Sequence, residues 1–140
     1  MDAPQALADL TEISSQVVDV AIVDRDGSVM ASTVENAARA ERFAAGIAEL
    51  VEQADALREA RGLPDLAHLE AATLEGSVFV VRRDGRSIAA TTRPDPTVGL
   101  VFYDLKHCLR SIEDAPASPS EPESEAPNPR ATKKETDAAA

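Results

Sequence analysis

The chain has 140 residues, the length of one ordinary domain, and it carries a formal net charge of −11 at pH 7. Such an acidic chain lacks the sequence-independent attraction to phosphates on which most nucleic-acid binders rely, so we expect no nucleic-acid partner. Cys108 is the only cysteine, which excludes an intrachain disulfide and leaves a cysteine-based zinc site without partners.

The sequence also carries no sign of a targeting or membrane segment. Its start, MDAPQALADL, has neither a basic region nor a long apolar run, and no window approaches 18 uninterrupted apolar residues. We therefore expect a cytoplasmic protein without membrane insertion.

The first third of the chain predicts a helix followed by a hairpin. Apolar residues recur at helical spacing from Leu7 onward, which predicts a short helix over 4–15. The run VDVAIVD, residues 18–24, is apolar on both alternating faces, as in a strand covered on both sides of a sheet. Asp26-Gly27 and a second β-prone run follow, and this dipeptide predicts a two-residue type I′ turn.

The longest predicted element is a helix over 36–62. Asn36 can cap its start and Gly62 can end it. A second face with Ala38, Ala45 and Ala48 either allows another helix to approach closely or reflects the high helix propensity of alanine. Its apolar stripe consists of Phe43, Ile47, Leu50, Val51, Ala54 and Leu57.

Three strands and a closing helix follow. Residues 66–76 alternate apolar and polar side chains, which is typical of an edge strand. Strands over 77–83 and 86–92 flank Asp84-Gly85, the strongest short-range hairpin signal. The Arg-Asp-Gly present at both hairpin tips is thus explained by turn chemistry, in preference to an integrin-type or metal-binding role. An apolar stripe then predicts an amphipathic helix from Val98 to Ile112.

The composition changes at Asp114. Residues 114–140 contain five of the nine prolines, no aromatic residue and no Leu, Ile or Val, so we predict a disordered tail after a domain at 1–113. The tail has six acidic and three basic residues, which leaves a net charge of −8 for residues 1–113. It is either a solvating extension or a docking segment for a partner.

No constellation of catalytic residues emerges, and we expect neither enzyme activity nor a cofactor or metal. His68 and His107 are far apart in sequence, and two histidines are too few for a typical metal site. Neighbouring helix residues point about 100° apart, which disfavours a Cys108–His107 nucleophile pair. Cys108 fits a small core residue better.

Arginines gather in the sequence around the second hairpin. They are either solvated surface residues or contacts for an acidic partner or for the glutamates of the tail. The candidates for partner binding are Arg82, Arg83, Arg86 and Arg93.

The predicted order α-β-β-α-β-β-β-α indicates an α+β fold, with a five-stranded antiparallel sheet flanked by helices. In this order, and in several motifs, residues 5–113 resemble the roadblock/dynein light chain family, especially its bacterial members related to gliding-motility GTPase regulators. VDVAIVDRDG matches the family's first hairpin. A long Ala-rich helix follows, and VGLVFYDL matches the start of the last helix.

The resemblance implies a profilin-like fold that forms a homodimer. Family members pack their long helices antiparallel and pair the following edge strand with its twin, which removes an exposed edge. They serve as regulators or scaffolds for Ras-like small GTPases and have no nucleotide site of their own. No Gly-x4-Gly-Lys-Ser/Thr loop is present here either. Carried over, the dimer interface comprises Phe43, Ile47, Leu50, Val51, Ala54, Leu66, His68, Leu69, Glu70 and Ala72.

The function that we expect is therefore a non-enzymatic homodimeric regulator or scaffold that binds a Ras-like GTPase. A small-molecule sensory module of profilin-like fold is the alternative, and it requires a pocket.

Overall fold

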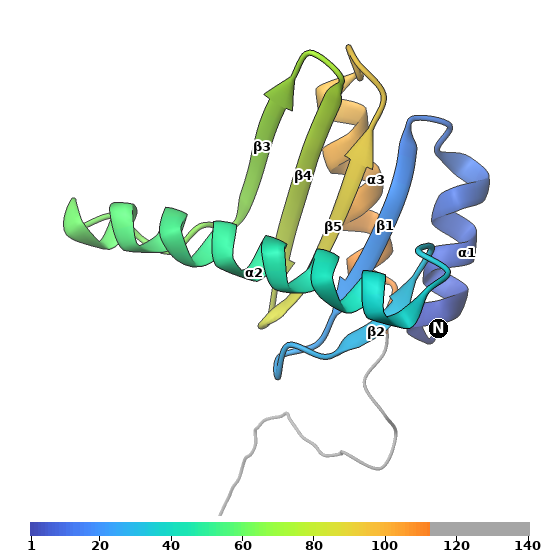
Figure 1. The fold of residues 1–140 in the computed structure, drawn as a ribbon, viewed down its shortest axis with the longest axis horizontal. Coiled ribbons are helices and arrows are strands. Elements are labelled where there is room, and N and C mark those ends of the chain that lie inside the picture. Colours follow the sequence, from blue (N-terminus) through green and yellow to red (C-terminus); the bar gives the residue numbers. More distant parts are fainter. Residues whose placement is uncertain (113–140) are drawn as a thin grey trace, which may run out of the picture.

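The computed structural model describes residues 1–112, which form one α+β unit (Figure 1). The predicted tail at 114–140 lies outside the described residues, as does the last residue of the predicted domain. In chain order the elements are α1 (Ala3–Ile13), β1 (Val17–Val23), β2 (Val29–Ser32), α2 (Ala37–Ala60), β3 (His68–Thr73), β4 (Gly76–Arg83), β5 (Arg86–Thr92) and α3 (Val98–Arg110).

The helix boundaries follow the capping signals in the sequence. The Asp2 side chain accepts a hydrogen bond from the N–H of Gln5 at 2.9 Å, and Asn36 accepts one from the N–H of Arg39 at 3.1 Å. Beyond the end of α2, Gly62 has a φ of 72°, in the left-handed region that stops a helix. The predicted long helix is confirmed, with its capping residues just outside it.

All five strands form one antiparallel sheet in the order β2-β1-β5-β4-β3. The first strand of the chain thus lies inside the sheet, between β2 and β5, and β3 lies at an edge. Both positions agree with the prediction. Because β1 pairs with β5, the β1–β2 and β4–β5 connections lie at the same end of the sheet (Figure 1).

The two hairpin tips have different turns. Asp84 and Gly85 both have positive φ, 53° and 81°, as the predicted type I′ turn requires. The same prediction for Asp26-Gly27 is wrong, because only Gly27 has a positive φ there, 89°. The N–H of Gly27 donates to the carbonyl oxygen of Asp24, and the N–H of Asp24 donates to the carbonyl oxygen of Ser28, so this turn is longer.

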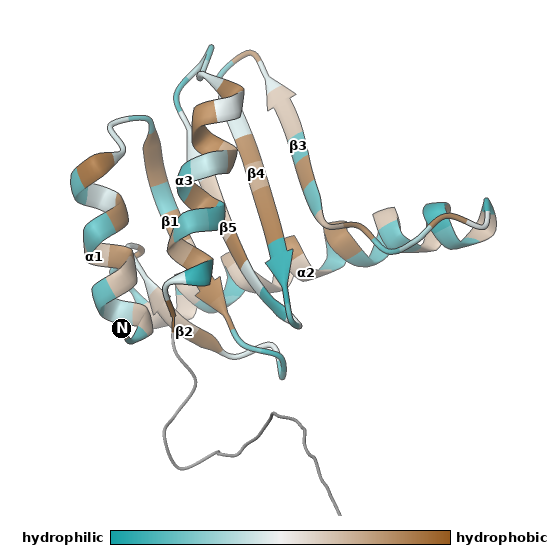
Figure 2. Ribbon diagram, turned by 180° about the vertical axis from the view of Figure 1, so that it is seen from behind, coloured by the Kyte–Doolittle hydropathy of each residue, from teal (hydrophilic) through white to brown (hydrophobic). Residues whose placement is uncertain are grey.

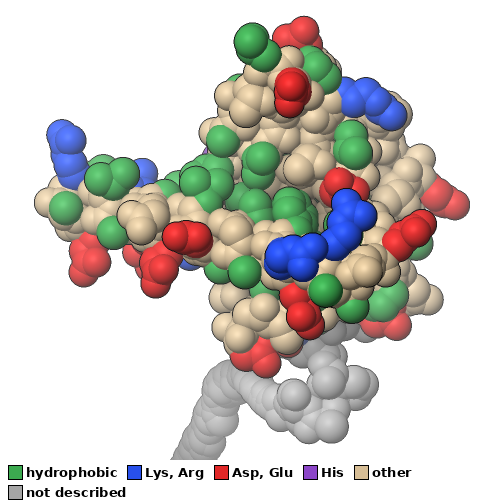
Figure 3. Space-filling model, in the orientation of Figure 1, with side chains coloured by type: hydrophobic (Ala, Val, Ile, Leu, Met, Phe, Trp, Pro, Cys, Tyr) green, Lys and Arg blue, Asp and Glu red, His purple; other side chains and the backbone are tan. Residues whose placement is uncertain are grey.

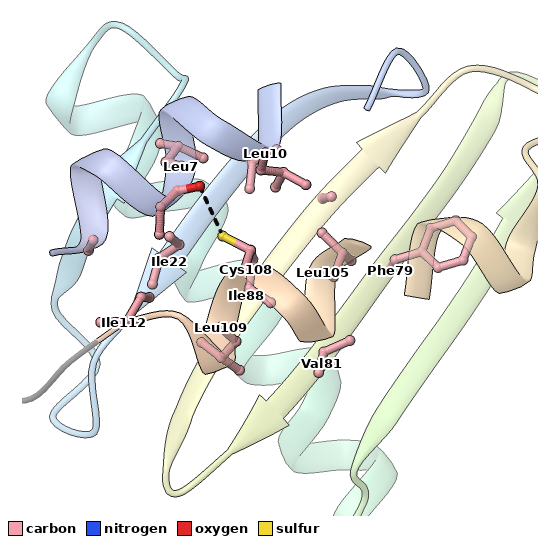
Figure 4. Packing of buried hydrophobic residues seen from close by; sticks show 14 of the residues in the cluster. Leu7, Leu10, Ile22, Phe79, Val81, Ile88, Leu105, Cys108, Leu109 and Ile112 are labelled. Carbon is pink, nitrogen blue, oxygen red and sulfur yellow. Dashed lines mark hydrogen bonds between the residues drawn. The ribbon is translucent and has the colours of Figure 1, made fainter. Parts of the chain in front are cut away.

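Helices α1 and α3 cover one face of the sheet (Figure 2) and enclose the larger core. Phe79 on β4 is the largest fully buried side chain in it. Figure 4 shows Cys108 in this core, where its thiol donates to the carbonyl oxygen of Ala6 at 3.4 Å. Other members include Leu7, Leu10, Ile22, Val81, Ile88, Leu105, Leu109 and Ile112.

Helix α2 lies on the opposite face, so helices flank both faces of the sheet as predicted. Ile47 and Val51 pack there against Val80 and Ala89 in a smaller core. The C-terminal part of α2 extends past β3 and beyond the sheet (Figure 1). Leu57 on this part is 72% exposed. The face under α2 therefore has less apolar cover than the face under α1 and α3.

Candidate interaction surface

The outer edge of β3 carries backbone groups that no strand of residues 1–112 pairs. β3 pairs with β4 alone, in a register that places Glu70 opposite Phe79. The N–H of Arg82 donates to the carbonyl of Ala67 at 2.8 Å, so the bonded pairs of this ladder recur at every second residue from Ala67. The N–H and C=O groups of the residues between them point away from β4: His68, Glu70 and Ala72.

An apolar face adjoins this edge. Phe43 on α2, Leu69 on β3 and Val78 on β4 are only partly buried, and they pack against the smaller core. Leu50 on α2 is 38% exposed. Figure 3 shows hydrophobic side chains gathered beside α2 on this face. A free strand edge and an incompletely covered apolar helix face thus lie on the same side of the molecule.

The structure divides the predicted interface residues into two groups. Ile47 and Val51 are buried inside the protomer and are part of its core. The ring of His68 packs against Phe102 of α3, with 4.7 Å between ring centroids, so its backbone rather than its side chain faces the edge. The remaining predicted residues are exposed or half-buried: Phe43, Leu50, Ala54, Leu66, Leu69, Glu70 and Ala72.

A polar clamp fixes α2 to the start of β3. Asp55 on α2 accepts hydrogen bonds from the N–H of Leu66 at 2.9 Å and from the guanidinium of Arg82 at 2.8 Å. Arg82 also donates from Nε to the carbonyl of Leu66 at 2.9 Å. These hydrogen bonds hold the pKa of Asp55 below its ordinary value of 3.8, and the bond from the Leu66 N–H has the largest effect. The clamp therefore sets the position of the free edge relative to α2.

Arg82 is thus engaged in the fold, and the four predicted partner-binding arginines do not form one patch. Arg93 lies after β5, at the opposite end of the sheet from the hairpin tips, and donates to the carbonyl of Ser15 at 2.9 Å. This separation corrects the predicted single cluster. Arg83 and Arg86 alone remain together, at the β4–β5 tip.

The two tips pack against each other. The side chain of Arg25 covers Gly85 so closely that a Cβ added there would lie 2.9 Å from Arg25 Cγ. Arg86 Nε lies 3.5 Å from a carboxylate oxygen of Asp24. Two Arg-Asp-Gly turns that are 58 residues apart therefore form one surface. Sequence reasoning identified the turns but missed this contact, because no local signal links Arg25 to Gly85.

A groove of about 1050 Å³ runs between α2 and these tips. Ala45 and Ala48, from the predicted small-residue face of α2, line one side. Arg25 and Arg83 line the other side. The groove thus combines a helix face of small apolar residues with a charged rim.

The two histidines considered for catalysis lie apart from each other. His68 contacts Phe102, whereas the ring of His107 stacks on Tyr103 at 6.4 Å between centroids. Cys108 is 3% exposed, and burial raises the pKa of its thiol to about 11, so it is protonated and inert at neutral pH. Within residues 1–112, no group of three or more His, Cys, Asp or Glu side chains is arranged to hold a metal ion.

One buried carboxyl group was not anticipated. Asp104 on α3 is 7% exposed and borders a cavity of about 180 Å³ between α1 and α3. Burial raises its pKa, and the nearby His107 partly offsets this effect.

In the described part of the chain, none of the helices combines the length and apolar character needed to cross a membrane.

No protein-family model and no curated protein matches the sequence. Solved structures match its fold. The Roadblock/LC7 domain from Streptomyces avermitilis has a TM-score of 0.69 at 16% identity, over 79% of this chain and 94% of that one. A structure of MglB with tetrameric arrangement has a TM-score of 0.67 at 14% identity, over 79% of this chain and 84% of that one. LokiProfilin2, in a complex with rabbit actin, has a TM-score of 0.51 at 16% identity, over 76% of this chain and 91% of that one.

An antiparallel five-stranded sheet with one long helix on one face and two helices on the other is a profilin-like domain, as these likenesses indicate. The chain has the roadblock form of this fold. The predicted fold class and the predicted resemblance to the roadblock/dynein light chain family are therefore confirmed at the level of the fold.

Proposed function

We propose that this protein is a cytoplasmic homodimer that regulates or scaffolds a Ras-like small GTPase without being an enzyme itself. The dimer forms through the outer edge of β3 and the neighbouring face of α2. The GTPase contacts the hairpin tips, where Arg83 and Arg86 lie.

The proposed dimer is supported chiefly by one observation, the free edge of β3 beside apolar residues of α2. An exposed edge strand invites pairing with another chain, and symmetric pairing of two copies removes that liability. The same two-fold arrangement covers Leu50 on α2 and the half-buried Leu69 on β3. Because the interface continues the sheet, its hydrogen bonds add to the burial of apolar surface.

The GTPase partner is supported by the family resemblance and by the likeness in fold to the Roadblock/LC7 domain and MglB structures. The sequence itself contains no phosphate-binding loop of the Gly-x4-Gly-Lys-Ser/Thr type. A non-enzymatic role fits the scattered histidines and the inert thiol of Cys108. The nucleotide would then be supplied by the partner.

The test is an affinity capture from a lysate of the source organism, with the full chain as bait in GDP or in a non-hydrolysable GTP analogue. We expect mass spectrometry to identify one Ras-like GTPase, enriched in a nucleotide-dependent manner. The captured GTPase is then purified, and titrations compare its dissociation constants for the parent and for Arg83→Gln. Capture of no GTPase in either nucleotide state would contradict the proposed partner.

The groove beside α2 favours one second candidate, a small-molecule sensory module. Its volume of about 1050 Å³ slightly exceeds the range of roughly 300–1,000 Å³ that is typical of ligand sites. A ligand of that module would lie against Ala45 and Ala48 and reach the charged rim. If no GTPase is captured and metabolite extracts raise the melting temperature of the purified chain, this candidate replaces the first.

A further inference from the structure

Four arginines meet at the end of the sheet that carries the hairpin tips. Arg25 belongs to the β1–β2 connection, Arg83 and Arg86 flank the β4–β5 turn, and Arg110 lies in the last turn of α3. Together with Ile112, they border a cavity of about 220 Å³. The last described residue of the chain therefore lies at a basic cavity.

The side chains that border this cavity carry more positive than negative formal charge, with four arginines and one aspartate, Asp84. Asp24 lies 3.5 Å from Arg86 and 3.8 Å from Arg25, and Asp84 lies 3.7 Å from Arg83. The planar fork of arginine suits the two oxygens of a carboxylate, and exposed arginines at such a site favour acidic ligands. In a chain of net charge −11, a basic cavity is a local exception.

The sequence that follows Ile112 has the opposite charge. Between Ile112 and Arg130 there is no basic residue. Glu121 follows Ile112 by nine residues, which span at most about 30 Å when fully extended, so only a short length of chain separates the two. Five acidic residues lie between Ile112 and Arg130: Glu113, Asp114, Glu121, Glu123 and Glu125.

We infer that this acidic segment, residues 113–125, binds the arginine cavity of its own chain. Single exposed ion pairs are weak, but a short tether holds the segment at an effective concentration on the order of millimolar, which suffices for weak contacts. Salt screens such contacts, so the docking is reversible and sensitive to ionic strength. The inference does not depend on the identity of the GTPase.

The experiment uses the full chain with a nitroxide label on Ser120→Cys. Cys108 stays unlabelled because its thiol is buried and protonated. Paramagnetic broadening of backbone amide signals is measured at Gly85, Arg86 and Arg110, at low and at high salt. We expect strong broadening at low salt and its loss at about 1 M salt, where the screening length falls to about 3 Å.

Charge variants separate docking from the proximity that the tether imposes on any tail. The triple variant Glu121→Gln, Glu123→Gln and Glu125→Gln keeps the length of the tail, and we expect it to lose the excess broadening. Arg83→Gln with Arg110→Gln should lose it as well. Arg61→Gln, an exposed arginine beyond the end of α2, is the matched control and should keep it. Equal broadening in all of these variants would overturn the inference.

Discussion

Two neighbouring alanines on β3 offer a direct test of the proposed dimer edge. The N–H of Ala72 points away from β4, whereas Ala71, opposite Val78, belongs to a bonded pair of the ladder. Proline removes the N–H and adds a ring in its place. Ala72→Pro should therefore block pairing with a second copy and leave the protomer intact, and Ala71→Pro should damage the protomer itself.

The magnitude follows from the hydrogen bonds that each variant removes. A two-fold dimer contains two copies of Ala72, so Ala72→Pro removes two bonds at about 1 kcal/mol each. A loss of about 2 kcal/mol corresponds to a dissociation constant about 30-fold weaker, before any clash of the rings is added. Ala71→Pro leaves the carbonyl of Val78 without its donor, and we expect it to lower the free energy of unfolding by about 2 kcal/mol.

Sedimentation velocity over a concentration series gives the dissociation constant. Urea unfolding, carried out at protein concentrations below the dissociation constant of the dimer, gives the free energy of unfolding of the protomer. Ile47→Glu would be a poor substitute for either proline, because Ile47 is buried in the protomer and its replacement would damage the fold first. If Ala72→Pro dimerises as tightly as the parent, or if Ala71→Pro is as stable as the parent, the assignment of the free edge is refuted.

Two further variants test the clamp and the packing of the sheet. Asp55→Asn should lower the free energy of unfolding by about 1 kcal/mol at pH 7, through its weaker bonds to Leu66 and Arg82. Because the folded-state pKa of Asp55 is depressed, its contribution is present above its unfolded pKa near 3.8 and is lost as the pH falls through the lower folded value. Urea unfolding at pH 7 and pH 3 should therefore show the difference shrinking in acid, and a constant difference would argue against the clamp. Gly76→Ala would place a Cβ 2.2 Å from the Thr92 carbonyl oxygen and should cost about 2 kcal/mol or more, whereas Gly46→Ala, with open space around it, should be neutral or stabilising. Equal melting temperatures for the two glycine variants would contradict this packing.

Local signals were sufficient to predict the elements of this fold. Asn36 and Gly62 bound α2 because capping depends on neighbouring residues, and Asp84-Gly85 forms its turn because both residues adopt positive φ. The same dipeptide signal failed at Asp26-Gly27, because the hairpin does not close as a two-residue turn there. The register of β1 with β2 shifts beside Val23, and the connection closes around Asp24 instead.

The candidate site was less accessible to sequence reasoning, since its geometry depends on which strands are neighbours. Pairing of β1 with β5 brings Arg25 over Gly85, and α3 then adds Arg110 from a third part of the chain. Spacing around one hairpin could suggest Arg83 and Arg86, but it also included Arg93, which the length of β5 places at the far end of the sheet. The repeated Arg-Asp-Gly is thus explained as turn chemistry in each hairpin, and the sheet order turns two separate tips into one basic surface beside the start of an acidic segment.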